Sequence, residues 1–390
     1  MKKIITIIMS LCMVFFLSAC GTTQTEKGSE STEDVILIGC ILPLSGTSAY
    51  DGESAMNGAK TAEKYINDKG GVANGRKIKL VFEDSATDPA TAAAAAEKLI
   101  NDDGVKILIG AFTSSCTAAV QPVAEADKIP LITSVATSGA LTKNGCKYFF
   151  RAVGISSLYI DSFAGKIINE LGAKNIAYIY ENGDWGLGSV NSFKEYAETH
   201  GVKTATIQVI NKGDVDLYTQ LTAIKESKPD AIYAVSNLAN AVRIAVQRRE
   251  LGIDCPMLGE GSWASGEFIE QTGAAGEGIY GMVEYLPDIK TDMNPLFKEM
   301  YRSVTDGKTP DKYAACEFNA VLVAADAVDN ATNPNDSTSI RDALKNTDMN
   351  TLTGPVKFEE NGQGYGFEVF LSRNRDGKAV CVDSATVAIR

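Results

Sequence analysis

The stretch from Val105 to Thr142, VKILIGAFTSSCTAAVQPVAEADKIPLITSVATSGALT, contains two short apolar segments that each run into a loop of small hydroxyl residues. The apolar segments, Val105 to Ile109 and Ile129 to Ile132, lack the polar alternation of a half-exposed strand. This pattern predicts parallel strands buried on both faces, with helices covering both sides of the sheet. We therefore expect a doubly wound α/β fold.

Hydroxyl residues follow both strands at the point where each one ends. The first loop is Phe112 to Ser115, before a helix that we expect to begin at Cys116, and the second is Ser134 to Ser138. In a doubly wound sheet, ligands bind beyond the carboxyl ends of the strands, where helix N-termini present free N–H groups. Each serine taken singly is better explained by helix capping or turn chemistry. The coincidence of two such loops favours a crevice that fits a carboxylate.

The N-terminal region has the pattern of a secretory signal. Lys2 and Lys3 precede an apolar run, Ile4 to Leu17, which is too short to span a bilayer comfortably. Leu-Ser-Ala-Cys, ending at Cys20, closely resembles the bacterial lipobox, whereas the alternative is an N-terminal anchor helix. We expect residues 1–19 to be a lipoprotein signal peptide, Cys20 to carry the lipid, and residues 20–34 to be a flexible tether. The folded part would then be anchored to the outer face of the cytoplasmic membrane.

The charge balance is acidic, with 37 basic against 49 acidic residues. Removal of residues 1–19 takes away two lysines and leaves 35 − 49 = −14. A chain of this charge is not suited to nucleic acid, so we expect no nucleic-acid partner. The length beyond Val35 is enough for about two lobes of ordinary domain size, and we expect a monomer.

The cysteines give little support for a metal site or a cysteine nucleophile. Six remain beyond the lipobox, no C-x-x-C motif occurs, and His200 is the one histidine. Buried free thiols are the favoured interpretation, although export permits disulfides whose pairing cannot be read from spacing. These cysteines are Cys40, Cys116, Cys146, Cys255, Cys316 and Cys381.

Strands and helices alternate along the rest of the chain. In the first part we expect strands at Val35–Ile41 and Arg76–Phe82 and helices at Gly52–Asp68 and Pro89–Asn101, the second capped by Asp88. Pro122 predicts a kink or a late restart of its helix. The later strands are expected at Asn175–Tyr180, Lys203–Ile210, Ala231–Val235, Pro256–Leu258, Gly276–Leu286, Val356–Phe358, Phe367–Leu371 and Ala379–Val382. The later helices are expected at Ser157–Leu171, Leu187–Thr199, Val215–Ser227, Leu238–Leu251, Leu296–Val304 and Tyr313–Asn330.

A series of motifs resembles the extracytoplasmic leucine/isoleucine/valine-binding proteins of ABC importers, in family order from about Val35 to the end. They are LPLSGTSAYDGESAMNGA, INDKGGVANGRKIKL, EDSATDPATAAAAAEKLI, LIGAFTSS, PLITSVATSGALT, YENGDWGLG and TGPVKFEENGQG. The resemblance implies a type I periplasmic-binding fold, in which two α/β lobes joined by three crossovers close on an amino acid. Lobe 1 would comprise residues 35–154 and 288–362, and lobe 2 residues 155–287 and 363–390. The implied partner is the membrane permease of an ABC importer.

The resemblance also assigns roles to matching residues. Ser114 and Thr137 would hold the ligand carboxylate, and the Val135 carbonyl, the Thr137 hydroxyl and an acid of lobe 2 would meet the ammonium group. Trp185 in GDWGLG would lie against the ligand. The remaining residues expected at or beside the pocket are Tyr50, Phe112, Ser115, Ala136, Asn237 and Tyr313.

The sequence departs from the family pattern at two positions. The acid of lobe 2 is expected at Gly261, whereas Glu260 stands one residue earlier; Glu260 or Glu317 could replace it, or the ligand could lack an ammonium group. Asn237 stands where leucine-type binders often carry an aromatic residue, which weakens the case for an aliphatic ligand and leaves another small acid or amide open. Trp263 is equally compatible with a pocket and with a core position.

An exported α/β enzyme is the rival class. The glycines Gly183, Gly186 and Gly188 are spaced G-x-x-G-x-G, no P-loop or G-x-S-x-G occurs, and Ser262 in GEGSW lacks a recognisable strand and helix around it. We therefore expect no catalytic residue, no metal and no cofactor. Delivery of the ligand to a sensory receptor instead of a permease is a third possibility.

Overall fold

The computed structural model describes residues 35–388, so the predicted signal, the lipidation at Cys20 and the tether lie outside the described residues. The first sheet is entirely parallel, with strand order β2-β1-β3-β4-β5. Its strands are β1 (Val35–Leu42), β2 (Lys77–Asp84), β3 (Leu108–Ile109), β4 (Leu131–Thr133) and β5 (Phe149–Arg151). In this order the chain runs outward from β1 in both directions, so a crevice lies between the carboxyl ends of β1 and β3.

Helices on both faces bury the apolar strands. They are η2 (Gly46–Ser48), α1 (Ala49–Asp68), α2 (Pro89–Asn101), α3 (Ser114–Ala126) and η3 (Gly139–Thr142). At α2 the predicted start is confirmed, because Oδ1 of Asp88 accepts the Thr91 N–H at 2.8 Å and Pro89 occupies the first turn. The predicted restart at Pro122 is wrong, since α3 continues through it. Proline removes one bond there, to the carbonyl of Ala118, and Ala118 is exposed to water.

The second sheet has strand order β15-β14-β10-β9-β8-β6-β7. The strands from β7 to β10 are parallel and repeat the order of the first sheet, whereas β14 and β15 are antiparallel. The strands are β6 (Asn175–Glu181), β7 (Lys203–Ile210), β8 (Ala231–Ser236), β9 (Met257–Gly261), β10 (Tyr280–Val283), β14 (Glu368–Arg375) and β15 (Lys378–Thr386). The prediction of two doubly wound, mainly parallel sheets is therefore confirmed.

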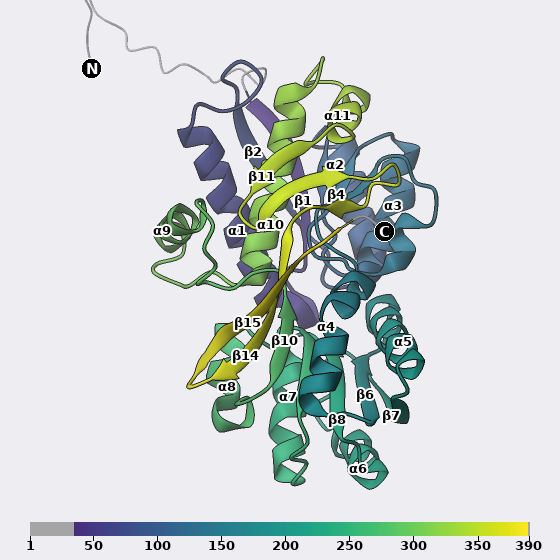
Figure 1. Ribbon diagram of the computed structural model, residues 1–390. Helices are drawn as coiled ribbons and strands as arrows, with labels where there is room; N and C mark the ends of the chain where they lie inside the picture. The colour runs from purple at the N-terminus through teal and green to yellow at the C-terminus, as the bar shows by residue number, and fades with distance from the viewer. Residues whose placement is uncertain (1–34, 389–390) are drawn as a thin grey trace, which may run out of the picture. The chain divides into compact units, whose positions relative to one another are not determined.

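The remaining elements complete the layers around the two sheets. The helices are α4 (Ser156–Leu171), α5 (Asp184–Thr199), α6 (Tyr218–Ser227), α7 (Leu238–Glu250), α8 (Gly266–Thr272), η4 (Gly273–Ala275), α9 (Asn294–Val304), α10 (Lys312–Asn330) and α11 (Ser337–Leu344). A small antiparallel sheet contains β11 (Asp348–Thr351), β12 (Gly354–Phe358) and β13 (Gly364–Tyr365). Figure 1 shows α1 and α10 packed side by side although they are far apart in the sequence.

Several local predictions were wrong. The expected strand from Val105 is reduced to Leu108–Ile109, because a buried apolar run can pack without joining the hydrogen-bond ladder. Helices α8 and α11, each of eight residues or fewer, were not predicted, since periodicity is weak over two turns. The motif GEGSW begins within β9, whose last residue is Gly261, and precedes α8, contrary to expectation. Trp263 is a core residue, fully buried against Phe268.

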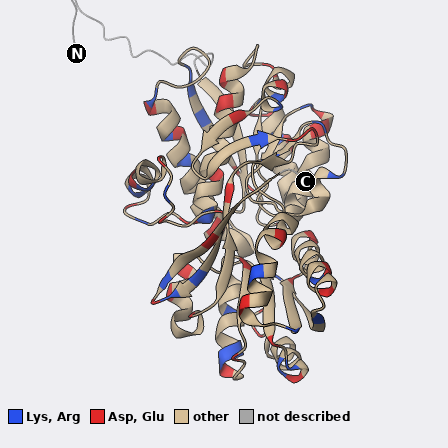
Figure 2. Ribbon diagram, viewed as in Figure 1, with Lys and Arg blue, Asp and Glu red and all other residues tan. Residues whose placement is uncertain are grey.

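Charged residues of both signs are spread along the helices in Figure 2. Within residues 35–388, none of the helices combines the length and apolar character needed to cross a membrane. In this same part of the chain, no group of three or more His, Cys, Asp or Glu side chains could hold a metal ion. The six cysteines are free, and Cys40, Cys116 and Cys316 are buried.

Candidate functional site

A pocket of about 580 Å³ lies where the carboxyl ends of strands from both sheets meet. The loop after β3 contributes one wall, the loop after β4 another, and the ends of β6, β8 and β9 face them from the second sheet. The lining residues are Phe112, Thr113, Ser114, Ser115, Val135, Ala136, Thr137, Glu181, Asn182, Gly183, Asp184, Trp185, Gly186, Lys212, Asn237, Glu260, Glu284, Lys312 and Tyr313. This position is where the topology of two doubly wound sheets places a ligand site.

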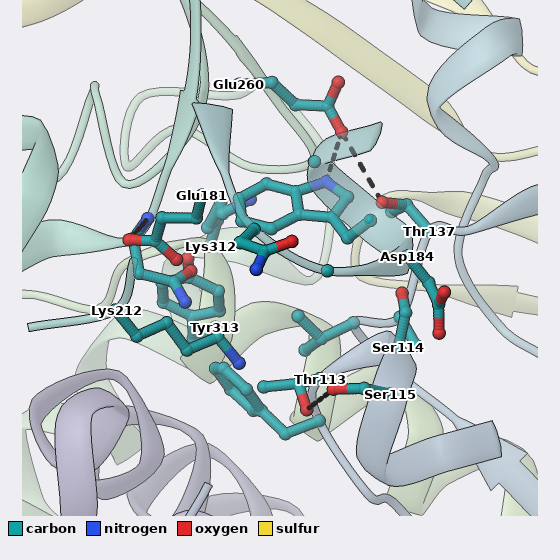
Figure 3. Close-up of a pocket in the computed structure, with 18 of the residues that line it drawn as sticks. Thr113, Ser114, Ser115, Thr137, Glu181, Asp184, Lys212, Glu260, Lys312 and Tyr313 are labelled. Atoms are coloured by element: carbon teal, nitrogen blue, oxygen red, sulfur yellow. Dashed lines mark hydrogen bonds between the residues drawn. The ribbon is translucent and has the colours of Figure 1, made fainter. Parts of the chain in front are cut away.

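The N-terminus of α3 forms the first wall. Thr113 is its cap, with Oγ1 accepting the Cys116 N–H at 3.3 Å, so Ser114 and Ser115 occupy the first turn, where N–H groups lack intrahelical partners. The Ser114 Oγ accepts the Ser138 N–H at 3.2 Å, which ties this turn to the second hydroxyl loop. Figure 3 shows Ser114 and Thr137 on the same side of the pocket. The helix N-terminus and these hydroxyls are suited to a carboxylate.

A buried arginine holds the second hydroxyl loop, Ser134 to Ser138, in place. Nη1 of Arg151, at the end of β5, donates to the carbonyl of Ala136 at 2.8 Å. Burial lowers the pKa of Arg151 to about 9. The Ser156 N–H donates to the Thr137 carbonyl at 3.1 Å, and the Ser156 Oγ lies 3.0 Å from the Thr137 Oγ1. These bonds fix the orientation of Thr137.

Glu260, at the end of β9, accepts hydrogen bonds from neutral donors of α4, α5 and β8. Its Oε1 accepts from the Ser156 Oγ at 2.6 Å and from the Trp185 Nε1 at 2.7 Å, and Thr137 Oγ1 lies at 3.5 Å. Its Oε2 accepts from the Tyr233 OH at 2.7 Å and from the Ser189 Oγ. Figure 3 shows the contact between Glu260 and Thr137 as a dashed line. These donors are hydroxyl and indole groups, and none of them carries a charge.

Geometry explains why an acid stands at 260 and not at 261. Gly261 has φ +118°, and a Cβ there would lie 2.1 Å from the Ser236 carbonyl oxygen. A side chain at 261 therefore cannot be accommodated. The other candidate acid, Glu317, does not line the pocket; it accepts a hydrogen bond from the Ser134 Oγ behind the wall, and burial raises its pKa to about 7.

Aromatic residues border the pocket near the start of α10. The rings of Phe112 and Tyr313 lie 5.1 Å apart, and Phe112 has φ +67°, an unusual conformation for a bulky residue. The Tyr313 OH lies 2.9 Å from the Ser262 Oγ, which joins α10 to the loop after β9. Tyr50 is not part of this pocket; it is partly exposed and borders a separate cavity beside Tyr301 and Lys308.

A buried ion pair also lines the pocket, at the start of α10. The Lys312 Nζ is 3.0 Å from the Glu284 Oε2, and both side chains are nearly inaccessible. Burial alone would lower the pKa of Lys312, but the nearby Glu284 raises it above its ordinary value. Because the two charges compensate each other, neither is free to pair with a ligand group.

The wall opposite the hydroxyl loops carries charged and amide groups. Glu181 ends β6, Lys212 follows β7, and Asn237 caps α7. In Figure 3, Glu181 and Lys212 lie on the side away from Ser114 and Thr137. The Glu181 Oε1 accepts the Asn237 backbone N–H at 3.1 Å. This end of the pocket is polar.

The structure brings ten of the predicted residues together at the pocket and leaves out Tyr50. The ten are Ser114, Val135, Thr137, Trp185, Glu260, Phe112, Ser115, Ala136, Asn237 and Tyr313. The pocket is also lined by charged residues that were not predicted from the sequence, namely Glu181, Asp184, Lys212, Glu284 and Lys312. Glu181 could have been found as the residue that ends a buried strand. The pairing of Glu284 with Lys312 has no local signal, because the two residues come from different elements.

Comparisons with known proteins agree with this architecture. A family model described as periplasmic binding protein matches residues 35–373. A leucine-, isoleucine-, valine-, threonine- and alanine-binding protein of Pseudomonas aeruginosa is 29% identical over 339 residues, covering 86% of this chain and 88% of its own. A leucine-binding protein of Thermotoga maritima superposes with TM-score 0.83 at 26% identity, over 90% of this chain and 99% of its own. A branched-chain amino acid substrate-binding protein of Streptococcus pneumoniae, in complex with isoleucine, gives 0.82 at 27% identity, over 90% and 99%.

Proposed function

Because the chain belongs to the periplasmic binding protein family, whose members are extracytoplasmic solute-binding proteins of ABC transport and not enzymes, we propose that it captures an α-amino acid in this pocket. It would then deliver the amino acid to an ABC permease. Relatives named for leucine, isoleucine and valine binding support an amino acid as the ligand. The observation that carries the proposal is that a helix N-terminus and a carboxyl group whose hydrogen-bond donors are all neutral border one pocket.

The two ends of a zwitterion match these two groups. In the proposal, the first turn of α3, the Ser114 hydroxyl and Thr137 hold the ligand carboxylate, where the helix dipole favours negative charge. The ammonium group meets the Val135 carbonyl and Glu260. Since the protein donors to Glu260 are neutral, an ammonium group would supply the compensating charge. Trp185, held by its bond to Glu260, would cover the ligand.

Binding of this kind would also let a permease distinguish the ligand-bound protein from the ligand-free protein. Glu260 belongs to the second sheet, and Ser114 and Thr137 belong to loops of the first. We propose that residues 35–154 with 288–362, and residues 155–287 with 363–390, form two lobes that close on the ligand. A ligand contacting both lobes stabilises the closed state by its preference for that state. The permease would recognise the closed form.

A second candidate ligand is a small acid without an amino group. The observation that favours it is that Glu260 already accepts four short hydrogen bonds from the protein, which is about the capacity of a carboxylate. A thermal-shift screen of the purified protein, unfolded and refolded to remove carried ligand, separates the candidates. We expect L-amino acids to raise the melting temperature. A rise only with acids that lack an ammonium group would replace the first candidate with the second.

A further inference from the structure

Glu181 lines the pocket and has one carboxylate oxygen without a protein partner. The side chain is 3% exposed, and its Oε1 accepts the Asn237 N–H and the Asn240 Nδ2–H, both at 3.1 Å. Its Oε2 is buried and has no hydrogen bond within residues 35–388. Burial raises the pKa of Glu181, against the opposing effect of these donors and of Lys212. A buried acceptor without a hydrogen bond costs free energy, so a ligand N–H that donates to this oxygen would contribute favourably to binding.

Lys212 is tied to Glu181 through a short chain of amide contacts. Asn240 donates both to the Glu181 Oε1 and to the Asn211 carbonyl, the latter at 2.9 Å. The Asn211 N–H donates to the Asp214 Oδ2 at 2.7 Å, which closes the turn that carries Lys212. Figure 3 shows the Lys212 ammonium group directed into the pocket. The backbone turn that carries Lys212 is therefore connected to Glu181 by one network.

We propose that Glu181 and Lys212 select the ligand side chain, and that the preferred ligand is an amino acid whose side chain ends in a carboxamide. This proposal rests on the proposed function, because it assigns the opposite end of the same pocket. The amide N–H₂ would donate to the Glu181 Oε2, and the amide oxygen would accept from the Lys212 ammonium group. Asn237, at the same wall, adds a further polar surface.

The charges at this wall disfavour the other side-chain classes. An aliphatic side chain would leave the Glu181 Oε2 buried without a partner and would desolvate Lys212. A cationic side chain would pair with Glu181 but repel the Lys212 ammonium group, and an anionic one would pair with Lys212 but repel Glu181. A neutral group that both donates and accepts meets both residues. A site built to hydrogen-bond a polar group rejects analogues that lack it strongly.

Isothermal titration of the refolded protein tests the proposal with L-glutamine and L-asparagine against L-leucine, L-lysine and L-glutamate. We expect one of the two amides to bind at least about tenfold more tightly than the other three ligands. Tighter binding of leucine, lysine or glutamate would overturn the side-chain assignment while leaving the proposed function intact. Binding of no amino acid would overturn the proposed function itself.

Two variants separate selection from a structural role. Glu181→Gln and Lys212→Met should each reduce the affinity for the amide about tenfold or more, and neither should weaken the affinity for leucine, because each removes a charge that disfavours an aliphatic side chain. Glu226→Gln and Lys106→Met are matched controls on exposed positions and should change neither affinity. Equal losses for the amide and for leucine would assign Glu181 and Lys212 a structural role and contradict the proposal.

Discussion

The Trp185 Nε1 donates to the Glu260 Oε1 at 2.7 Å, so the residue that we expect to cover the ligand is held by the residue that we expect to charge-pair with it. Trp185 comes from the start of α5 and Glu260 from the end of β9. Strand order places both ends at the same edge of the second sheet. The residue expected to cover the ligand and the residue expected to pair with its ammonium group therefore form one hydrogen-bonded unit.

Removal of the carboxylate-binding hydroxyls should weaken ligand binding. We expect Ser114→Ala and Thr137→Ala each to raise the Kd of an amino-acid ligand roughly tenfold to a hundredfold, because each removes a hydrogen bond to a charged group. Titration calorimetry measures the effect. Ser162→Ala, on the exposed side of α4, is the control and should leave the Kd unchanged. Wild-type affinity in both pocket variants would refute the placement of the ligand carboxylate.

Neutralising Glu260 should cost affinity for ligands that carry an ammonium group. Glu260→Gln removes the compensating charge, and we expect a loss of roughly 2 kcal/mol or more in binding free energy. The corresponding des-amino acid should not lose affinity, which separates charge pairing from damage to the pocket. Equal affinity of the variant and the wild type for an amino acid would show that another group meets the ammonium.

Tryptophan fluorescence should report ligand binding through one residue. The chain has two tryptophans; Trp185 lines the pocket, and Trp263 is buried against Phe268. Ligand addition should change the emission of the wild type, and Trp185→Phe should abolish the change while retaining the emission of Trp263. A persistent ligand-dependent change in this variant would place the ligand away from Trp185.

The strands, the helices and the hydroxyl loops could be predicted from the sequence. The chemistry of the wall opposite the hydroxyl loops, where Glu181 and Lys212 lie, could not. Asp88 with Pro89 predicts the start of α2 because the cap and the first turn are local features. Ser114 and Thr137 follow buried strands, so topology alone brings them together. Apart from Trp185, the partners of Glu260 are hydroxyl groups from distant elements, and serines such as Ser189 have no distinctive spacing. Only the folded chain reveals such partnerships.

The glycine at 261 should be required for folding. A Cβ at this position would meet the Ser236 carbonyl at 2.1 Å, and the positive φ is unfavourable for other residues. We expect Gly261→Ala to lower the free energy of unfolding by about 2 kcal/mol or more in urea titrations. Gly266→Ala is the matched control, since a Cβ there meets no atom within 4 Å. A harmless Gly261→Ala would remove the steric reason for the position of the acid.

The buried carboxyl of Asp51 should make stability depend on pH. Burial, with Asp311 nearby, raises its pKa from 3.8 to about 8. Between these values the folded state keeps a proton that the unfolded state has released, so the free energy of unfolding falls as pH rises, by at most about 1.4 kcal/mol per pH unit. Urea titrations from pH 5 to pH 8 should show a shallower decline for Asp51→Asn than for the wild type. Asp292→Asn, at an exposed position, should follow the wild type, and parallel curves for all three proteins would disprove the assignment.

The central claim is that this pocket binds both ends of an amino acid. The most direct test is calorimetric titration of the refolded protein with the best amino acid from the thermal-shift screen, with the amine that lacks its carboxylate, and with the acid that lacks its ammonium group. We predict that the amino acid binds and that each one-ended analogue binds at least about a hundredfold more weakly, because each leaves Glu260 or the N-terminus of α3 without its charged partner. Equal binding of the acid that lacks the ammonium group would contradict the account.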